Sequence, residues 1–337
     1  MSDVKNVLWF ILIGVLFAGF FILEGFDYGV GIMLPFVSKT DEERRVVLNT
    51  IGPFWDGNEV WLLTAGGAIF AAFPNWYATL FSGFYLALFL ILLALIVRGV
   101  AIDFRSKVEN ATWRKTWDVL FFVGSLLPAL LFGVAVSNFL TGVPIDANME
   151  FVGNLFTLIT PFTLLGGIVF VLVFAFHGCL FLSLKSGVKE INERVKAYSV
   201  KIGAVMLAVV VAWVIYGALI TGILHSVIAI IATVIAAICL IAAVVLQYKG
   251  KSGIAFVASI IAILAVTVMV FATMFPNVLI STLNPLWSLT IHNACSSPYT
   301  LKIMTIVAVT LVPIVLCYQA WSFWIFRKRV TKNDLHY

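Results

Sequence analysis

The sequence predicts an all-α, polytopic membrane protein with nine transmembrane helices. Of its 337 residues, 62% are hydrophobic and only 11% are charged, whereas about a quarter of the residues in soluble domains are charged. The mean hydropathy is +1.10. Apolar runs also recur along the whole chain, and each is at least the length of about 20 residues that a helix needs to cross the hydrocarbon core.

Nine apolar runs are expected to form the membrane-spanning helices. They lie at about 7–35, 53–73, 77–99, 118–140, 158–184, 200–221, 224–247, 253–276 and 300–326. The first run follows neither a basic segment nor a small-residue cleavage site, so we expect it to be retained as a span. We expect residues 1–337 to form a single integral membrane domain, and two four-helix bundles plus one peripheral helix fit the count.

The basic residues predict the orientation of these spans. The segments after odd-numbered spans and the C-terminal tail hold nearly all of the 21 lysines and arginines, and the opposite side keeps only Lys5 and Lys302. The positive-inside rule therefore places the N-terminus outside and the C-terminus in the cytoplasm. Because the basic residues lie where they set topology, the net charge of +5 does not indicate a nucleic-acid partner.

The cysteines and histidines argue against disulfide, metal and haem sites in this chain. The four cysteines show no CxxC spacing, so we expect neither a disulfide framework nor a metal site. Only His177 is expected inside a span, and we interpret it as a histidine hydrogen-bonded within the bundle. Since a haem needs axial ligands on facing helices, this chain is not expected to ligate one. The outer segments 141–157 and 277–299 are long enough to fold over the bundle.

Polar side chains inside the first two spans are the main candidates for function. Glu24 and Asp27 lie in the first span, and Asp56, Asn58 and Glu59 lie in the second. An ionised carboxyl at the centre of a membrane helix costs about 3 kcal/mol. The i, i+3 spacing places each pair of acids on one helix face, and we expect both faces to point into the bundle, with at least one acid protonated or hydrogen-bonded. The pattern predicts a proton path that opens to the cytoplasm.

A structural role is the alternative for these acids, either as helix caps or as partners of Arg98 and Asn58. Arg98 and Asp103, at the inner end of the third span, are the candidate counter-ions. Small residues beside the acids would let the helices approach closely. They are Gly25, Gly29, Gly31, Gly57, Gly66 and Gly67.

Several longer motifs resemble subunit II of the cytochrome bd-type quinol oxidases. The most specific is the block GPFWDGNEVWLLTAGGAIFAAFP at 52–74. Others run from the first span to the last: GFDYGVG at 25–31, TGVP at 141–144, MFPNVLIST at 274–282 and SSPYTLKIMT at 296–305. The resemblance implies the nine-helix fold and a location in the bacterial plasma membrane.

The resemblance also implies a heterodimer with a haem-bearing subunit I. Such complexes oxidise membrane quinol and reduce dioxygen to water, take their protons from the cytoplasm, and so generate a proton-motive force. Subunit I supplies the ligands for the haems b and d. A structural quinone in this chain and an additional small single-span subunit are left open, and the short segment 221–225 contains no quinol-binding loop.

The resemblance assigns roles to three residues. Acids that match Glu24 and Asp56 belong to the proton path, and Trp61 matches a position near an apolar route for dioxygen, with simple helix packing as its alternative. Other members have Asp at the position of Glu24, which keeps a carboxyl, and Gln at that of Glu59, which does not.

Two other functions remain to be compared with this one. A proton-coupled secondary transporter would use the same carboxyls, but transporters tend to show inverted repeats, and here the acids gather in the first two spans. A purely structural scaffold for subunit I would make the acids dispensable.

Overall fold

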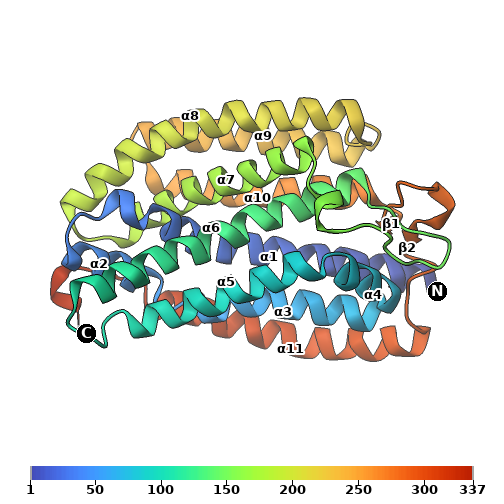
Figure 1. The fold of residues 1–337 in the computed structure, drawn as a ribbon, viewed down its shortest axis with the longest axis horizontal. Coiled ribbons are helices and arrows are strands. Elements are labelled where there is room, and N and C mark those ends of the chain that lie inside the picture. Colours follow the sequence, from blue (N-terminus) through green and yellow to red (C-terminus); the bar gives the residue numbers. More distant parts are fainter. Residues whose placement is uncertain (1, 336–337) are drawn as a thin grey trace.

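A computed structural model describes residues 2–335 of the chain, and long helices account for most of them. These helices run side by side along one axis, and the two ends of the chain lie at opposite ends of the bundle (Figure 1). The helices are α1 (Ser2–Val37), α2 (Asp41–Ile51), α3 (Trp55–Ala72), α4 (Pro74–Gly83), α5 (Tyr85–Phe104), α6 (Ala111–Thr141), α7 (Pro161–Lys185), α8 (Lys189–Ile220), α9 (Val227–Tyr248), α10 (Ser252–Met274) and α11 (Pro298–Ile325). A hairpin of β1 (Asn277–Leu279) and β2 (Leu289–Thr290) precedes α11.

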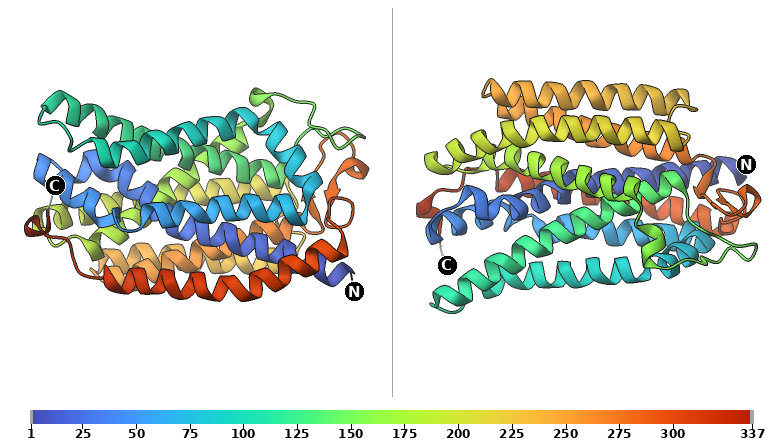
Figure 2. Two further views of the ribbon diagram at one scale, coloured as in Figure 1. Left: turned by 90° about the horizontal axis from the view of Figure 1, so that it is seen from below. Right: turned by 45° about the horizontal axis from the view of Figure 1, so that its top comes forward.

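The long helices form two neighbouring groups. Helices α1, α3, α5 and α6 make up the first group and α7–α10 the second, and α1 and α6 pack on α7 between them. Helix α11 packs against α3 and α1 at the periphery of the first group (Figure 2). The central position of α1 explains why Glu24 and Asp27 are buried.

Glycine permits the closest approach between α1 and α7. A Cβ atom on Gly29 would lie 1.9 Å from the backbone oxygen of Phe174 and 2.8 Å from the backbone of Gly178. The expectation of close packing is confirmed here. It is wrong for Gly57 and Gly67, because a Cβ at either position would have nothing within 4 Å among the described residues.

Eight helices of the described chain are long and apolar enough to cross a membrane. Helix α3 is not among them, since Asp56, Asn58 and Glu59 in its first turns lower its hydropathy. The predicted third span at 77–99 is wrong in its bounds. Pro74 begins the separate helix α4, the chain turns at Phe84, and the long helix that follows is α5.

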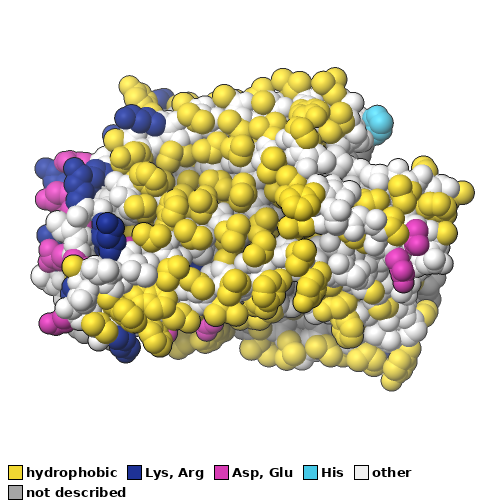
Figure 3. All heavy atoms as spheres, viewed as in Figure 1, with side chains coloured by type: hydrophobic (Ala, Val, Ile, Leu, Met, Phe, Trp, Pro, Cys, Tyr) yellow, Lys and Arg dark blue, Asp and Glu magenta, His cyan; other side chains and the backbone are white. Residues whose placement is uncertain are grey.

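The two ends of the bundle differ in chemistry. The segments that follow α6 and α10 meet over the end that holds the N-terminus, where Val143 pairs with Ser281, as expected for covering loops. Lysines and arginines gather at the other end, and an apolar surface lies between (Figure 3). Helix α2 lies at the basic end and was not predicted. It begins with a capping box between Thr40 and Glu43.

Candidate functional site

A buried arginine brings the acids of two helices together. Arg98 of α5 is fully buried and forms an ion pair with Glu24 of α1, which is also fully buried. Its Nη1 lies 3.0 Å from Oε1 of Glu59 of α3, whose side chain is 20% exposed. The guanidinium also lies over the ring of Tyr28, 4.9 Å from the ring centroid. A buried charge needs such partners, because an unpaired one in a low dielectric is costly.

The second buried acid, Asp27, lies one helical turn from Glu24 and is linked to α3. Both side chains are fully buried, and Oε2 of Glu24 and Oδ1 of Asp27 have no hydrogen-bond partner within the described chain. Two buried carboxyls this close to each other disfavour the state in which both are ionised. The amide nitrogen of Asn58 donates to Oδ2 of Asp27 at 2.7 Å and to the carbonyl oxygen of Leu23 at 3.4 Å. The acids of the first span therefore face the interior, as predicted.

Helix α11 contributes a residue that the sequence did not single out. The side chain of Gln319 donates from Nε2 to Oδ1 of Asn58 at 3.0 Å, and its Oε1 accepts from the indole nitrogen of Trp61 at 2.9 Å. The signal that could have revealed it is an amide within an otherwise apolar stretch, since an amide in a membrane helix normally bonds across helices.

Two predicted members lie outside this cluster. Asp56 is exposed on the outer side of α3 and forms no hydrogen bond or ion pair with the rest of residues 2–335. The expectation that both acids of α3 point into the bundle is therefore wrong for Asp56. Successive residues of a helix are rotated by about 100°, so of Asp56, Asn58 and Glu59 only Asn58 is fully buried. Asp103 is exposed near the end of α5 and forms no ion pair within the described chain.

The cluster keeps unused hydrogen-bonding capacity. The hydroxyl of Tyr28 and the Nε and Nη2 atoms of Arg98 are buried and have no hydrogen-bond partner within the described chain. Buried polar atoms in proteins are nearly always satisfied, often by ordered water. The cluster thus offers sites at which a proton carrier could be hydrogen-bonded.

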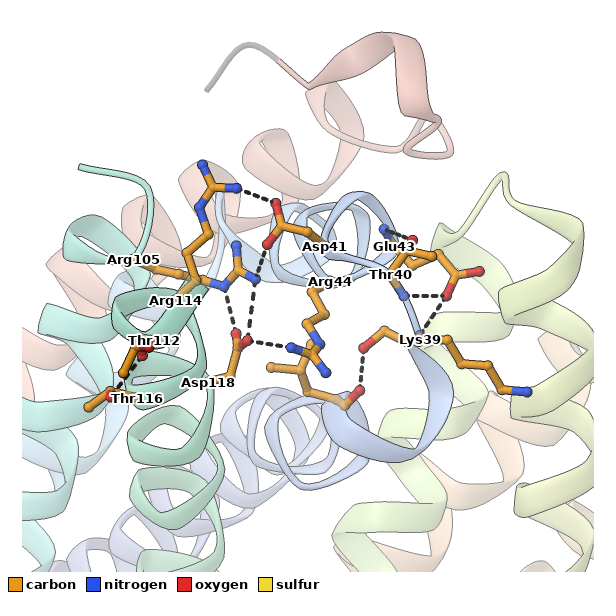
Figure 4. Close-up of polar contacts among 12 residues, drawn as sticks. Lys39, Thr40, Asp41, Glu43, Arg44, Arg105, Thr112, Arg114, Thr116 and Asp118 are labelled. Carbon is orange, nitrogen blue, oxygen red and sulfur yellow. Dashed lines mark hydrogen bonds and ion pairs between the residues drawn. The ribbon is translucent and has the colours of Figure 1, made fainter. Parts of the chain in front are cut away.

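An ion-pair network lies at the basic end of the bundle, around α2 (Figure 4). Asp118 of α6 accepts from Arg44 of α2 at 2.9 Å and from Nε of Arg105 at 2.6 Å. Asp41 of α2 accepts from Arg105 at 2.7 Å and from Arg114 at 2.9 Å. Partial burial raises the pKa of the Asp41 carboxyl, but the two arginines outweigh it, so this pKa lies below its usual range. These contacts join α2 to α5 and α6.

Comparison with known proteins identifies the family. The sequence profile described as "Cytochrome bd terminal oxidase subunit II" matches residues 5–326. The chain belongs to this family. It is therefore a multi-pass protein of the bacterial plasma membrane, and the transporter alternative has no support.

Individual relatives of this subunit II agree over nearly the whole chain. "Cytochrome bd ubiquinol oxidase subunit 2" of Bacillus subtilis (strain 168) is 44% identical over 330 residues, which cover 97% of each chain. "Cytochrome bd-I ubiquinol oxidase subunit 2" of Escherichia coli (strain K12) is 36% identical over 368 residues, covering 99% of this chain and 97% of that one. The solved bd oxidase from Geobacillus thermodenitrificans superposes with a TM-score of 0.78 at 15% identity, over 96% of this chain and 100% of that one, and supports the fold alone.

The described part of this subunit II presents no group of three or more His, Cys, Asp and Glu residues that could hold a metal ion. His177 has partners for both ring nitrogens: Nδ1 lies 2.7 Å from the hydroxyl of Ser259 and Nε2 lies 3.1 Å from the carbonyl oxygen of Ile22. Its ring is also stacked on Phe256 with centroids 4.7 Å apart. These contacts support the interpretation of His177 as a structural residue.

A cavity of about 180 Å³ lies between the two helix groups of the subunit. Its lining is apolar apart from three side chains with polar atoms, and these atoms are already bonded. The hydroxyls of Thr233 and Thr267 donate to carbonyls of their own helices, and the indole of Trp213 donates to Ser137. The lining thus suits an apolar chain but does not fit the carbonyls of a quinone ring, which need hydrogen-bond donors.

Proposed function

We propose that this chain gives protons access from the cytoplasm to a haem-bearing subunit I, and that the complex oxidises quinol and reduces dioxygen to water. The two relatives described above carry names of ubiquinol oxidase subunits. The observation that carries the proposal is the fully buried carboxyl pair of Glu24 and Asp27 on one face of α1, next to Arg98. Such a pair can accept and release protons within the membrane.

The proposed proton path requires α3 to cross the membrane as well, in addition to the eight helices described above. At 1.5 Å per residue, its 18 residues extend over about 27 Å, close to the thickness of the hydrocarbon core. An odd number of crossings also accounts for chain ends at opposite sides of the bundle (Figure 1). By the positive-inside rule, the gathering of basic residues supports a cytoplasmic C-terminal end.

The proton route follows the exposure of the carboxyls. Glu59 is partly exposed and Asp56 is fully on the surface of α3, in the first turn of a helix whose N-terminus favours negative charge. Protons would enter at these acids and reach Glu24 and Asp27 inside. The exposed face of α3 that carries Asp56 continues through Val60, Leu63 and Phe70, which are 48–72% exposed. This face would lie against subunit I.

The haems belong to the partner in this proposal. When bound there, they supply the electron-transfer and oxygen chemistry, while this chain holds and moves protons. For Trp61, the contacts support the packing alternative more than an oxygen route, because its indole is bonded to Gln319 and its ring covers Gly19.

Carboxyl variants in the assembled complex test this function. Asp27→Asn should lower quinol oxidation and oxygen consumption at least tenfold, because an amide cannot pass a proton on, while the haem spectrum stays at wild-type intensity. Glu109→Gln, in an exposed segment at the same end of the bundle, is the matched control and should keep full turnover. Normal turnover of a fully haem-loaded Asp27→Asn complex would contradict the proton path.

A further inference from the structure

Helix α11 is fastened to the bundle at its two ends. At the outer end, the indole nitrogen of Trp9 donates to the hydroxyl of Thr305 at 3.1 Å. At the cytoplasmic end, Phe323 is stacked on Phe54 with ring centroids 4.4 Å apart, and the ammonium group of Lys185 donates to carbonyls of the tail that follows the helix. Between these anchors the helix is largely exposed.

Gln319 is the exception in this exposed stretch. Residues 311–318 and 320 are all exposed, whereas Gln319 is partly buried and forms the two hydrogen bonds to α3 described above. One helical turn separates Gln319 from Phe323, so the stacking of Phe323 on Phe54 fixes the level at which Gln319 meets α3. A polar contact across helices is therefore built into the only inward-facing position of this stretch.

The donors and acceptors in the chain of contacts fix both amide orientations. The indole of Trp61 can only donate, so it must meet the carbonyl oxygen of Gln319. The amide nitrogen of Gln319 then faces Asn58 and meets its carbonyl oxygen. Consequently, the amide nitrogen of Asn58 faces Asp27 and the carbonyl oxygen of Leu23. A flipped Asn58 would instead place its oxygen against the oxygens of Asp27 and Leu23, and its nitrogen against the amide nitrogen of Gln319.

We propose that Gln319 is a positioning residue of the acid cluster, which holds the amide nitrogen of Asn58 on the carboxyl of Asp27. Gln319 touches neither acid. It acts through Asn58, and Trp61 in turn orients Gln319. The peripheral helix α11 thereby takes part in the proton path, and this inference rests on the proposed function of Asp27.

Two variants of the complex separate the orienting role from simple packing. Gln319→Met keeps the length of the side chain but removes both hydrogen bonds. Gln319→Glu still accepts from Trp61 but, when ionised, presents an oxygen to Asn58, so the Asn58 amide is driven to flip. Each variant should lower kcat for quinol oxidation about tenfold, the factor expected from the loss of one hydrogen bond to a charged group. The KM for quinol and the haem content should stay unchanged.

The solvent hydrogen isotope effect on kcat provides the decisive readout. It should rise in both variants, since proton transfer becomes the slow step, and a merely structural role would not raise it. Gln247→Met is the matched control, because Gln247 is a buried membrane amide that bonds Ser199 and Ser183 away from the acids. It should keep the wild-type kcat and isotope effect.

The outcomes distinguish a failure of the positioning role of Gln319 from a failure of the proposed proton path. Wild-type kcat and isotope effect in both Gln319 variants, together with an inactive Asp27→Asn complex, would overturn the positioning role alone. Full activity of Asp27→Asn as well would overturn the proposed function. A fall in kcat that is matched by an equal loss of haem, with no change in the isotope effect, would reduce Gln319 to a packing residue.

Discussion

Replacement of Arg98 by methionine is the sharpest test of how the acid cluster is held. Methionine has a similar reach but no charge, so it leaves Glu24 buried without its partner. Both side chains are 0% exposed, and removal of one partner of a buried ion pair costs about 3–5 kcal/mol. The second acid, Glu59, adds less because it is partly exposed. We therefore expect the free energy of unfolding to fall by about 3–5 kcal/mol.

A double-mutant cycle shows whether the loss arises from the stranded carboxylate. Glu24→Gln in the Arg98→Met background removes the unpaired charge, and most of the lost stability should return, because apolar or neutral replacement of a whole buried pair is often nearly neutral. The cycle consists of the wild type, the Arg98→Met and Glu24→Gln single variants and the double variant. A denaturant titration of each purified complex in mild detergent gives the four midpoints. Arg327→Met, at an exposed arginine, should change the free energy by less than about 0.5 kcal/mol.

Two results would refute the reasoning. The first is an Arg98→Met complex as stable as the wild type, which would mean that Glu24 does not need the arginine. The second is a double variant no more stable than Arg98→Met, which would mean that packing, not charge, supplies the loss.

Three further changes test other parts of the structure. Asp118→Asn should lower the free energy of unfolding by about 3 kcal/mol, because it removes the ion-pair partner of Arg44 and one of the two partners of the buried Arg105. Glu42→Gln, in a pair about half exposed on both sides, should cost under about 1 kcal/mol, and equal midpoints for the two variants would contradict the network. Lys185→Met should release the C-terminal tail, so trypsin should remove the tail faster in limited proteolysis, and an unchanged rate would show that the tail is held otherwise. Gly29→Ala should cost about 3 kcal/mol or more through overpacking and lower the yield of the complex, while Gly253→Ala, with no atom closer than 3.9 Å to the added carbon, should leave the yield intact.

The spans were predictable because hydropathy follows a requirement that acts along the chain. Every residue of a span must tolerate lipid or the bundle interior, so apolar runs mark the helices within a few residues. The prediction failed at 77–99 because Pro74 and the turn at Phe84 interrupt an apolar stretch without adding polar residues. Helix α2 was not predicted because its apolar face, which buries Val46, Val47 and Ile51, is too short to resemble a span.

The acid cluster was only half predictable. Spacing i, i+3 places Glu24 and Asp27 on one face, and the central position of α1 buries both of them. The same spacing in α3 cannot say how far that helix is rotated, and the rotation turns Asp56 outward and Glu59 to the boundary. Gln319 was missed since its partners lie about 260 residues earlier in the chain, and the sequence holds no trace of that contact beyond one polar residue.

The charge of the buried cluster limits how the relay can work. Arg98 keeps its proton at any physiological pH, so it balances charge and does not transfer protons. With one proton on the neighbouring buried carboxyls of Glu24 and Asp27, these two acids, Glu59 and Arg98 together carry one negative charge. Uptake of one more proton makes the cluster neutral, whereas loss of that single proton would leave two negative charges in a low dielectric. We therefore infer that the relay alternates between one and two protons on its carboxyls. The positive charge of Arg98 stabilises the state with a single proton inside the membrane.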